Sequence, residues 1–363
     1  MEAVMISKFT IVPFSVDSSN QKQINAWYIL QRNLRKEILP DESFLTIEEL
    51  LAHSFSMHEL RESVEWCIWN REDEAMVGLA GVHFSRQDSG SDTAYFTIQI
   101  DQNYRRSGIG SAFLRRIVET ATERGGKLLR VQTNDRCLSG EKFIIPTGAE
   151  IVHKGHFNIL VLKDVDKTLI KSWLGFPVQG FKELTIGNWE GITPEHRIQE
   201  ISDFYQVIYD AGKEQHGHSG YRFTPENVRE GEKVSISMGK KVHAIYAADA
   251  KSNRLLGLTK ISWYPSRPSV ASQGYTAVLP DARGKGIGRR LKAEMLQKVF
   301  RVMPETEYIR TGNADNNDAI LKINNELGFR HQMATKTWQI ETAALEEYLS
   351  KLILLPNTGH NQI

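Results

Sequence analysis

The chain has 363 residues, of which 45 are basic and 44 acidic, and a formal net charge of +1 at pH 7. This balance argues against a dedicated nucleic-acid-binding protein, because such proteins usually concentrate a surplus of basic residues on one face. The length exceeds the roughly 150 residues of a typical domain, so we expect two domains, and the hydrophobic content of 40% is typical of a globular protein.

Cysteine usage and hydrophobic segments argue against a secreted or membrane protein. Cys67 and Cys137 are far apart and have no metal-type spacing, so we interpret them as packing residues or free thiols. The N-terminal segment MEAVMISKFTIVPF lacks the basic leader and long apolar core of a signal peptide. No stretch reaches the roughly 18 to 20 apolar residues of a membrane span. We therefore expect a cytoplasmic protein without a metal site.

The first predicted elements are a strand and two helices. Alternating apolar residues predict a strand at residues 9–12. Apolar residues recur at helical spacing over residues 21–36, and Pro40 ends that helix. Thr46 then caps a second helix, with Glu49 three residues later in the position of a capping box.

The next elements occur twice along the chain, which indicates a duplication. Residues 65–84 predict two strands around a polar turn, and residues 242–263 repeat the pattern, with Gly78 and Gly257 at corresponding positions. Later in each half we predict a buried strand, at residues 128–133 and 308–311, and a final strand and helix, at residues 159–174 and 337–352.

A strand, a basic glycine turn and an amphipathic helix follow one another in each half. In the first half the strand and turn contain Ile98, Gln99, Ile100, Arg105, Arg106, Ser107, Gly108, Ile109, Gly110 and Ser111. In the second half they contain Thr276, Ala277, Val278, Arg283, Gly284, Lys285, Gly286, Ile287, Gly288 and Arg289. The helix that follows the second turn has an apolar stripe, and we predict that its other face meets water, with Arg290, Lys292, Glu294, Lys298 and Arg301.

The glycines and basic residues of these turns predict a binding site for an anion. Because glycine has no Cβ, backbone N–H groups can point into a common concavity where the helix begins. The helix dipole, worth roughly half a positive charge there, favours a diphosphate, and the basic side chains add full charges. A plain connection between strand and helix is the alternative for one such turn. The repetition of the basic glycine turn in both halves favours a diphosphate site over a plain connection.

Both turns resemble the acetyl-coenzyme A signature R/Q-x-x-G-x-G/A of the GCN5-related N-acetyltransferases. The second half also resembles a tandem subgroup related to mycothiol synthase, through residues that continue past the turn: Leu291, Lys292, Ala293, Thr311, Asn313, Asn317, Ile323, Asn324, Leu327, Gly328 and Phe329. The resemblance covers nearly the whole chain. It implies an α/β (α+β) fold of two tandem domains, each a mixed, mostly antiparallel twisted sheet flanked by helices.

Glycine and proline interrupt the periodicity between residues 174 and 181 and predict the domain boundary. We therefore expect an N-terminal domain at residues 1–174, a linker at 175–180, a C-terminal domain at 181–355 and a tail at 356–363.

The resemblance implies acetyl-coenzyme A (acetyl-CoA) as a co-substrate, with its pantetheine arm along residues 276–278. Asn313, Asn317 and Asn324 offer donors and acceptors to that arm, and helix capping is the alternative for the first two. The first half has Asp135 in place of Asn313 and a proline where the second half has a helix. We expect the second half to be catalytic and the first to bind the cofactor weakly or to serve structure.

Proton transfer is the part of the reaction that the resemblance leaves open. Many relatives carry a catalytic tyrosine where this chain has Asn324, and a glutamate where Gln273 is the nearest residue. Tyr275, Tyr246 and Asn324 remain candidate catalytic residues, and packing is the alternative for the two tyrosines. His216 and His218, in the segment GKEQHGHSGYR, are further candidates for a general base or for metal ligands. The alternative is that both are solvent-exposed residues of a loop.

The leading hypothesis is an N-acetyltransferase that moves an acetyl group to a primary amine of a metabolite or an amine-bearing antibiotic, as a monomer or homodimer. A non-catalytic acyl-coenzyme A sensor is one alternative, motivated by the missing tyrosine and glutamate. A protein or peptide N-terminal acetyltransferase with an open groove is another. Nucleic-acid binding through the basic turn is the least favoured hypothesis, and we expect neither a nucleic acid nor a membrane as partner.

Overall fold

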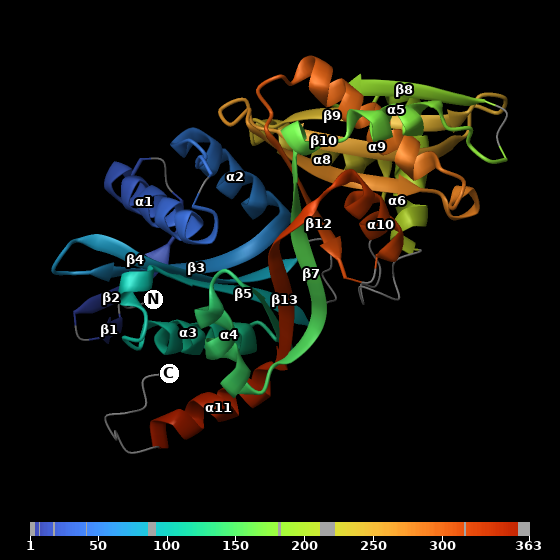
Figure 1. The fold of residues 1–363 in the computed structure, drawn as a ribbon. Helices are drawn as coiled ribbons and strands as arrows, with labels where there is room; N and C mark the ends of the chain where they lie inside the picture. The colour runs from blue at the N-terminus through green and yellow to red at the C-terminus, as the bar shows by residue number, and fades with distance from the viewer. Residues whose placement is uncertain are drawn as a thin grey trace. The chain divides into compact units, whose positions relative to one another are not determined.

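The structure is a computed structural model that describes residues 4–6, 8–16, 19–40, 42–85, 92–180, 183–210, 222–315 and 317–354. The chain forms two compact units (Figure 1). Unit 1 consists of Met1–Lys154 and Ala334–Ile363, and unit 2 consists of Gly155–Met333.

The sheet of unit 1 has the strand order β1-β2-β3-β4-β5-β6-β13. All neighbours are antiparallel except β5 and β6, which are parallel. Its strands are β1 Val4–Ile6, β2 Phe9–Phe14, β3 Arg61–Asn70, β4 Ala75–Ser85, β5 Thr93–Ile100, β6 Leu128–Asn134 and most of β13 Arg330–Glu341. Its helices are α1 Gln21–Ile38, α2 Ile47–Leu60, α3 Ile109–Glu123, α4 Leu138–Ile144 and α11 Thr342–Leu354, with short turns η1 Gln102–Tyr104 and η2 Ile145–Thr147.

The sheet of unit 2 has the order β7-β12-β11-β10-β9-β8, and only β11 and β12 are parallel. Its strands are most of β7 Glu150–Val161, β8 Leu184–Glu190, β9 Lys241–Asp249, β10 Leu255–Trp263, β11 Val270–Val278 and β12 Tyr308–Ala314. Its helices are α5 Lys167–Gly175, α6 Ile198–Asp210, α8 Pro225–Ser237, α9 Ile287–Val302 and α10 Asp318–Leu327, with η3 Leu162–Asp164, η4 Glu195–Arg197 and η5 Pro280–Ala282. Each unit is thus a mixed, mostly antiparallel sheet flanked by helices, as the sequence predicted.

The last strand and helix of each sequence half belong to the other unit. Strand β7 of the first half pairs with β12, where Val161 lies opposite Tyr308, and α5 packs on α9. Strand β13 of the second half pairs with β6, where Glu341 lies opposite Leu128, and α11 packs on α3 (Figure 1). The units therefore differ from the predicted domains, 1–174 and 181–355. Periodicity identifies a strand but not the sheet edge that it joins, and consecutive strands usually pair.

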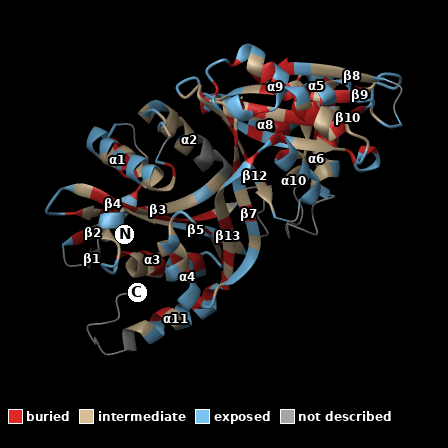
Figure 2. Ribbon diagram, in the orientation of Figure 1, coloured by how far each residue is buried: buried red, intermediate tan, exposed pale blue. Residues whose placement is uncertain are grey.

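Buried side chains of the exchanged segments complete the two hydrophobic cores. Leu160 and Trp173 belong to the core of unit 2, and Trp338 and Leu345 belong to that of unit 1. Figure 2 shows buried positions along the strands and along the inner face of α9. Burial of one large apolar side chain contributes about 1.5–3 kcal/mol, so the exchanged residues stabilise each unit substantially.

The predicted elements of the N-terminal region are confirmed. Helix α2 begins with the expected capping box: the Thr46 N–H donates to Glu49 Oε2 at 3.1 Å, and the Glu49 N–H donates to Thr46 Oγ1 at 3.2 Å. The final strands of the two halves begin earlier than predicted, at Glu150 and Arg330.

Two lysines that we predicted on the water-facing side of α9 are buried, so that prediction was wrong. Lys292 is 2% exposed, with Nζ 5.3 Å from the ring centroid of Phe329, and burial lowers its pKa to about 7. Lys298 is 7% exposed, and its Nζ donates to Asn188 Oδ1 and Glu190 Oε1, both at 3.0 Å. These neighbours come from distant segments that the helical pattern does not reveal.

In the described part of the chain, no helix combines the length and the apolar character that crossing a membrane requires.

Candidate active site

Strands β11 and β12 separate along their length and leave part of a strand edge open. They pair only between residues 270–273 and 308–311. Beyond this point β11 stays paired with β10, where Thr276 lies opposite Thr259 and Val278 lies opposite Gly257. A register shift in β10 between Thr259 and Ile261 accompanies the separation. Backbone N–H and C=O groups on the open edge are left for another partner, since polar backbone groups in a folded protein are normally hydrogen-bonded.

The turn after β11 forms a backbone concavity, which we call the cup, over residues 283–288. Gly284 and Gly286 have φ values of 76° and 96°, which favour glycine. A Cβ on Gly288 would lie 3.1 Å from Ile323 Cδ1, so the close approach of α9 and α10 also favours glycine. Gly286 caps α9 without a side-chain hydrogen bond. The first N–H groups of α9 are therefore available to an anion.

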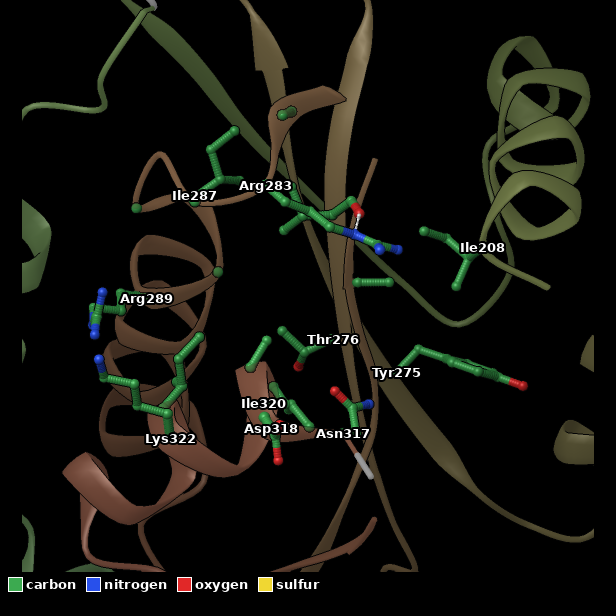
Figure 3. Close-up of a pocket in the computed structure, with 18 of the residues that line it drawn as sticks. Ile208, Tyr275, Thr276, Arg283, Ile287, Arg289, Asn317, Asp318, Ile320 and Lys322 are labelled. Carbon is green, nitrogen blue, oxygen red and sulfur yellow. Dashed lines mark hydrogen bonds between the residues drawn. The ribbon is translucent and has the colours of Figure 1, made fainter. Parts of the chain in front are cut away.

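The cup opens into a cavity of about 790 Å³ (Figure 3). Of the predicted site residues of the second half, those in its wall are Tyr275, Thr276, Ala277, Val278, Arg283, Gly284, Gly286, Ile287, Gly288, Arg289 and Asn317. Sequence reasoning missed other parts of the wall: the start of α10, with Asp318, Ala319, Ile320 and Lys322, and an aromatic group, with Tyr205, Tyr209 and Phe223. A signal for that group was available, because Tyr205 and Tyr209 are four residues apart and share a helix face.

Four predicted residues do not line this cavity. Lys285 Nζ donates to the carbonyl oxygen of Asp281 at 2.9 Å. Asn324 is buried, and its Nδ2 donates to Asn313 Oδ1 at 3.1 Å, a contact that ties α10 to β12. The guanidinium of Arg197 lies over the ring of Tyr246, and its Cζ atom is 4.3 Å from the ring centroid. The structure thus places these side chains in packing and tethering contacts.

The position of Gln273 also bears on catalysis, because many relatives carry a glutamate near it. The side chain is buried, and its Nε2 donates to Thr259 Oγ1 at 3.1 Å and to the carbonyl oxygen of Lys260 at 2.6 Å. An amide held in this way supports the bulged strand and does not titrate, so it cannot act as a general acid or base. His216 and His218 lie outside the described residues.

The cations of the cup differ in how they are held. Arg283 Nε donates to the carbonyl oxygen of Val278 at 3.1 Å, which aims the guanidinium across the cavity (Figure 3). No carboxylate of the described residues contacts this guanidinium. Arg289 instead pairs with both carboxylate oxygens of Glu326, at 2.8 and 2.7 Å. That pairing raises the pKa of Arg289 and lowers the pKa of Glu326.

The corresponding cup of unit 1 keeps the backbone shape but not the free cation. Arg105 Nε donates to the carbonyl oxygen of Ile100 at 3.0 Å, as Arg283 does to Val278. Its two terminal nitrogens, however, donate to both carboxylate oxygens of Glu37 at 2.7 and 2.5 Å, which raises the pKa of Arg105. Gln31 of α1 also donates to the side chain of Gln99 at 3.0 Å. Helix α1 thus covers part of the strand and neutralises the arginine.

The comparisons with known proteins agree with this duplicated arrangement. The model of the acetyltransferase (GNAT) family matches residues 25–137 and 205–329, which together exceed half of the chain. A search of curated proteins gave no match. The relation to mycothiol synthase stays a prediction.

Among solved structures, the chain is similar to a tandem GNAT protein from the clavulanic acid biosynthesis pathway, with 21% identity and a TM-score of 0.75 over 92% of this chain and 98% of that one. It is also similar to a GCN5-related N-acetyltransferase from Sphaerobacter thermophilus, with 13% identity and a TM-score of 0.62 over 93% of this chain and 97% of that one. At these identities the likeness shows the fold. Because the family model matches both halves, the chain belongs to the acetyltransferase (GNAT) family of acyltransferases and carries the family's domain twice.

Proposed function

We propose that unit 2 transfers the acetyl group of acetyl-CoA to a primary amine of a small molecule, in a complex that holds both reactants. One observation carries the proposal: the cup at the start of α9 and the open edge of β11 line the same cavity. The cup suits a diphosphate because it offers uncapped N–H groups and the Arg283 guanidinium. The open edge suits the amides of a pantetheine arm.

The order of residues along the cavity supports one orientation of acetyl-CoA. The cup follows the C-terminal end of β11, and the cavity wall continues through Val278, Ala277 and Thr276 to Tyr275. A linear molecule with its diphosphate in the cup therefore brings its thioester toward Tyr275. Much of the rate gain would come from holding the amine beside the thioester, since such positioning supplies about 7–11 kcal/mol in well-oriented reactions.

In the transfer, a bond forms between the amine nitrogen and the acetyl carbon, and the bond between that carbon and sulfur breaks. The amine loses a proton and the departing sulfur gains one. Tyr275 is our candidate donor of the second proton, because it lines the cavity and its hydroxyl makes no hydrogen bond to a described residue. Asn324 stands where many relatives have a catalytic tyrosine, and Gln273 is the residue nearest to the position of their glutamate. Neither side chain titrates.

Calorimetric titration with coenzyme A tests the cofactor assignment. Arg283→Glu reverses a charge in the cup, and Gly286→Val places a β-branched residue at φ 96°. We expect each substitution to weaken binding at least tenfold. Arg301→Glu is the matched control, because it makes the same charge reversal on an exposed residue in the last turn of the same helix. Unchanged affinity in the two cup variants would refute the assignment.

Release of free thiol across a panel of small primary amines tests the chemical step. We expect amine-dependent release from acetyl-CoA that the Arg283→Glu variant loses. Release at the rate of background hydrolysis with every amine, together with tight binding of coenzyme A, would indicate a binding protein instead of a transferase.

A further inference from the structure

The end of the cavity that lies away from the cup is built from aromatic rings. Tyr205 and Tyr209 come from α6, Phe223 precedes α8, and Tyr275 lies on β11. The ring centroid of Tyr205 lies 5.5 Å from that of Phe223 and 5.7 Å from that of Tyr275. The ring centroids of Tyr209 and Phe223 are 5.8 Å apart. These spacings are typical of interacting aromatic pairs. We call these four side chains the aromatic end.

Charge is distributed unevenly along the cavity. Among its cations, Arg289 and Lys322 lie near the cup and α10, whereas the Arg283 guanidinium extends from the cup toward the side of Ile208 in Figure 3. Figure 3 shows Tyr275 and Ile208 on the side of the cavity opposite Arg289 and Lys322. Asp318, in the first turn of α10, is the one carboxylate among the described residues of the wall. The four side chains of the aromatic end carry no formal charge, and their polar groups are the hydroxyls of three tyrosines.

A cation already occupies one face of this end. Lys260 Nζ lies 5.2 Å from the ring centroid of Tyr205 and 5.7 Å from that of Trp189, within the range of cation–π attraction. Burial lowers the pKa of Lys260 and raises the pKa of Tyr205. Lys260 is not among the described residues that line the cavity, and the nearby Glu232 carboxylate acts to raise the pKa of both Lys260 and Tyr205. The described residues of the cavity wall include three cations, Arg283, Arg289 and Lys322, and one carboxylate, so the wall disfavours acceptors with several positive charges.

We propose that the acceptor is an amine carried on an aromatic or other planar apolar group, which stacks among Tyr205, Tyr209, Phe223 and Tyr275. The inference rests on the proposed function, because that function places the thioester beside Tyr275. It narrows the acceptor class: polyamines and sugars with several amino groups are disfavoured, and arylalkylamines are favoured. Stacking of the acceptor's ring on the rings of the aromatic end would add binding free energy beyond that of burying its apolar area.

The experiment is a calorimetric titration of the full chain, both alone and saturated with coenzyme A, using 2-phenylethylamine, n-butylamine and spermidine as probes. We expect 2-phenylethylamine to bind at least tenfold more tightly than either other amine. Equal affinities, or a preference for spermidine, would overturn the inference. The titration of the chain alone does not need the cofactor, so the three amines can be compared even if coenzyme A fails to bind. Failure of coenzyme A to bind would refute the proposed function, and this result is distinct from the order of the amine affinities.

Two variants locate the bound ring. Tyr275→Ser and Phe223→Leu each remove a ring of the aromatic end, and we expect each to weaken 2-phenylethylamine binding at least fivefold. Because Phe223 lies outside the proposed path of coenzyme A, Phe223→Leu should change coenzyme A binding less than twofold. Tyr95→Ser is the matched control, because Tyr95 is an exposed tyrosine on β5 of unit 1, 40% exposed against 61% for Tyr275. Arg283→Glu should give the opposite result, with coenzyme A binding lost and amine binding kept.

A longer acyl group is the competing occupant of the aromatic end. To distinguish this acyl group from the proposed amine, hexanoyl-coenzyme A and acetyl-CoA are each titrated into the wild-type chain and into the Tyr275→Ser variant. We expect the substitution to change both affinities equally. A selective loss of hexanoyl-coenzyme A binding with unchanged amine binding would assign the aromatic end to the acyl chain and overturn the inference.

Discussion

Arg105 and Glu37 form a two-bond ion pair in the cup of unit 1, at 2.7 and 2.5 Å, whereas Arg283 in the cup of unit 2 contacts no carboxylate of the described residues. The two arginines make the same hydrogen bond to the preceding strand, so the difference lies in the partner that helix α1 supplies. An arginine paired in this way has little attraction left for a phosphate.

The ion pair predicts one strong coenzyme A site per chain. Glu37→Gln removes the carboxylate and should add a second, weaker site, visible as an increased stoichiometry in calorimetry. The pair is mostly buried, so the same substitution should lower the free energy of unfolding by about 1–3 kcal/mol. The double variant Glu37→Gln with Arg105→Met is the control, because it lacks the freed cation and should bind one equivalent. Two equivalents bound by the wild-type chain would contradict this prediction.

The cups also predict a matched pair of stability changes. Arg106 and Gly284 occupy the same place in the two turns, with φ values of 63° and 76°. A residue with a Cβ is disfavoured there by roughly 1–2 kcal/mol. Gly284→Ala should therefore lower the midpoint of thermal unfolding, and Arg106→Gly should leave it unchanged or raise it. A decrease of equal size in both variants would show that backbone conformation is not the cause.

Tyr275 and Tyr246 give a test of proton transfer. Tyr275→Phe keeps the ring but removes the hydroxyl, so kcat should fall about a hundredfold, at the low end of general acid catalysis, with little change in the KM for acetyl-CoA. Tyr246→Phe should change kcat less than twofold, because Tyr246 does not line the cavity. Steady-state kinetics with 2-phenylethylamine or the best amine of the panel decide the matter. A fully active Tyr275→Phe variant would exclude this hydroxyl as the acid.

Buried Lys292 predicts a dependence of stability on pH. Its pKa is lowered from 10.5 to about 7 in the folded chain, so between these values the unfolded chain binds more protons. Stability contributed by this site therefore rises with pH, by up to about 1.4 kcal/mol per pH unit, from pH 7 to pH 10. Lys292→Met should stabilise the chain most at pH 7 and progressively less above it. Urea unfolding of both chains at pH 7, 8 and 9 gives the difference, and a gap that widens with pH would contradict the prediction.

The exchange of final elements predicts how fragments behave. A fragment of residues 1–174 lacks Trp338 and Leu345, which complete the core of unit 1. It should lack a cooperative unfolding transition alone and gain one when mixed with a fragment of residues 181–363. Circular dichroism during thermal unfolding and size-exclusion chromatography measure both effects. Cooperative unfolding of the isolated 1–174 fragment would favour the boundaries that the sequence alone predicts.

The cup and most secondary structure were predictable because their causes are local. Positive φ at Gly284 and Gly286 needs only glycine, and the start of α9 follows directly. The capping box at Thr46 and Glu49 lies within four residues of sequence. Such features depend on neighbours that a sequence pattern contains.

Features that depend on distant segments were not predictable in the same way. Glu37 is many residues from Arg105, and no local pattern pairs them. Lys298 looks like a solvent-exposed helix residue until β8 supplies Glu190 as its partner. The exchange of β7 and β13 likewise depends on which strand each one pairs with. Alternation of apolar and polar residues along a strand does not determine its partner.

A crystal structure of the chain with bound coenzyme A would show whether the cup of unit 2 holds the diphosphate. We expect the diphosphate in the cup of unit 2, within hydrogen-bonding distance of the N–H groups at the start of α9 and of the Arg283 guanidinium, with the thiol directed toward Tyr275. A complex in which that cup is empty and coenzyme A occupies another part of the protein would contradict this expectation.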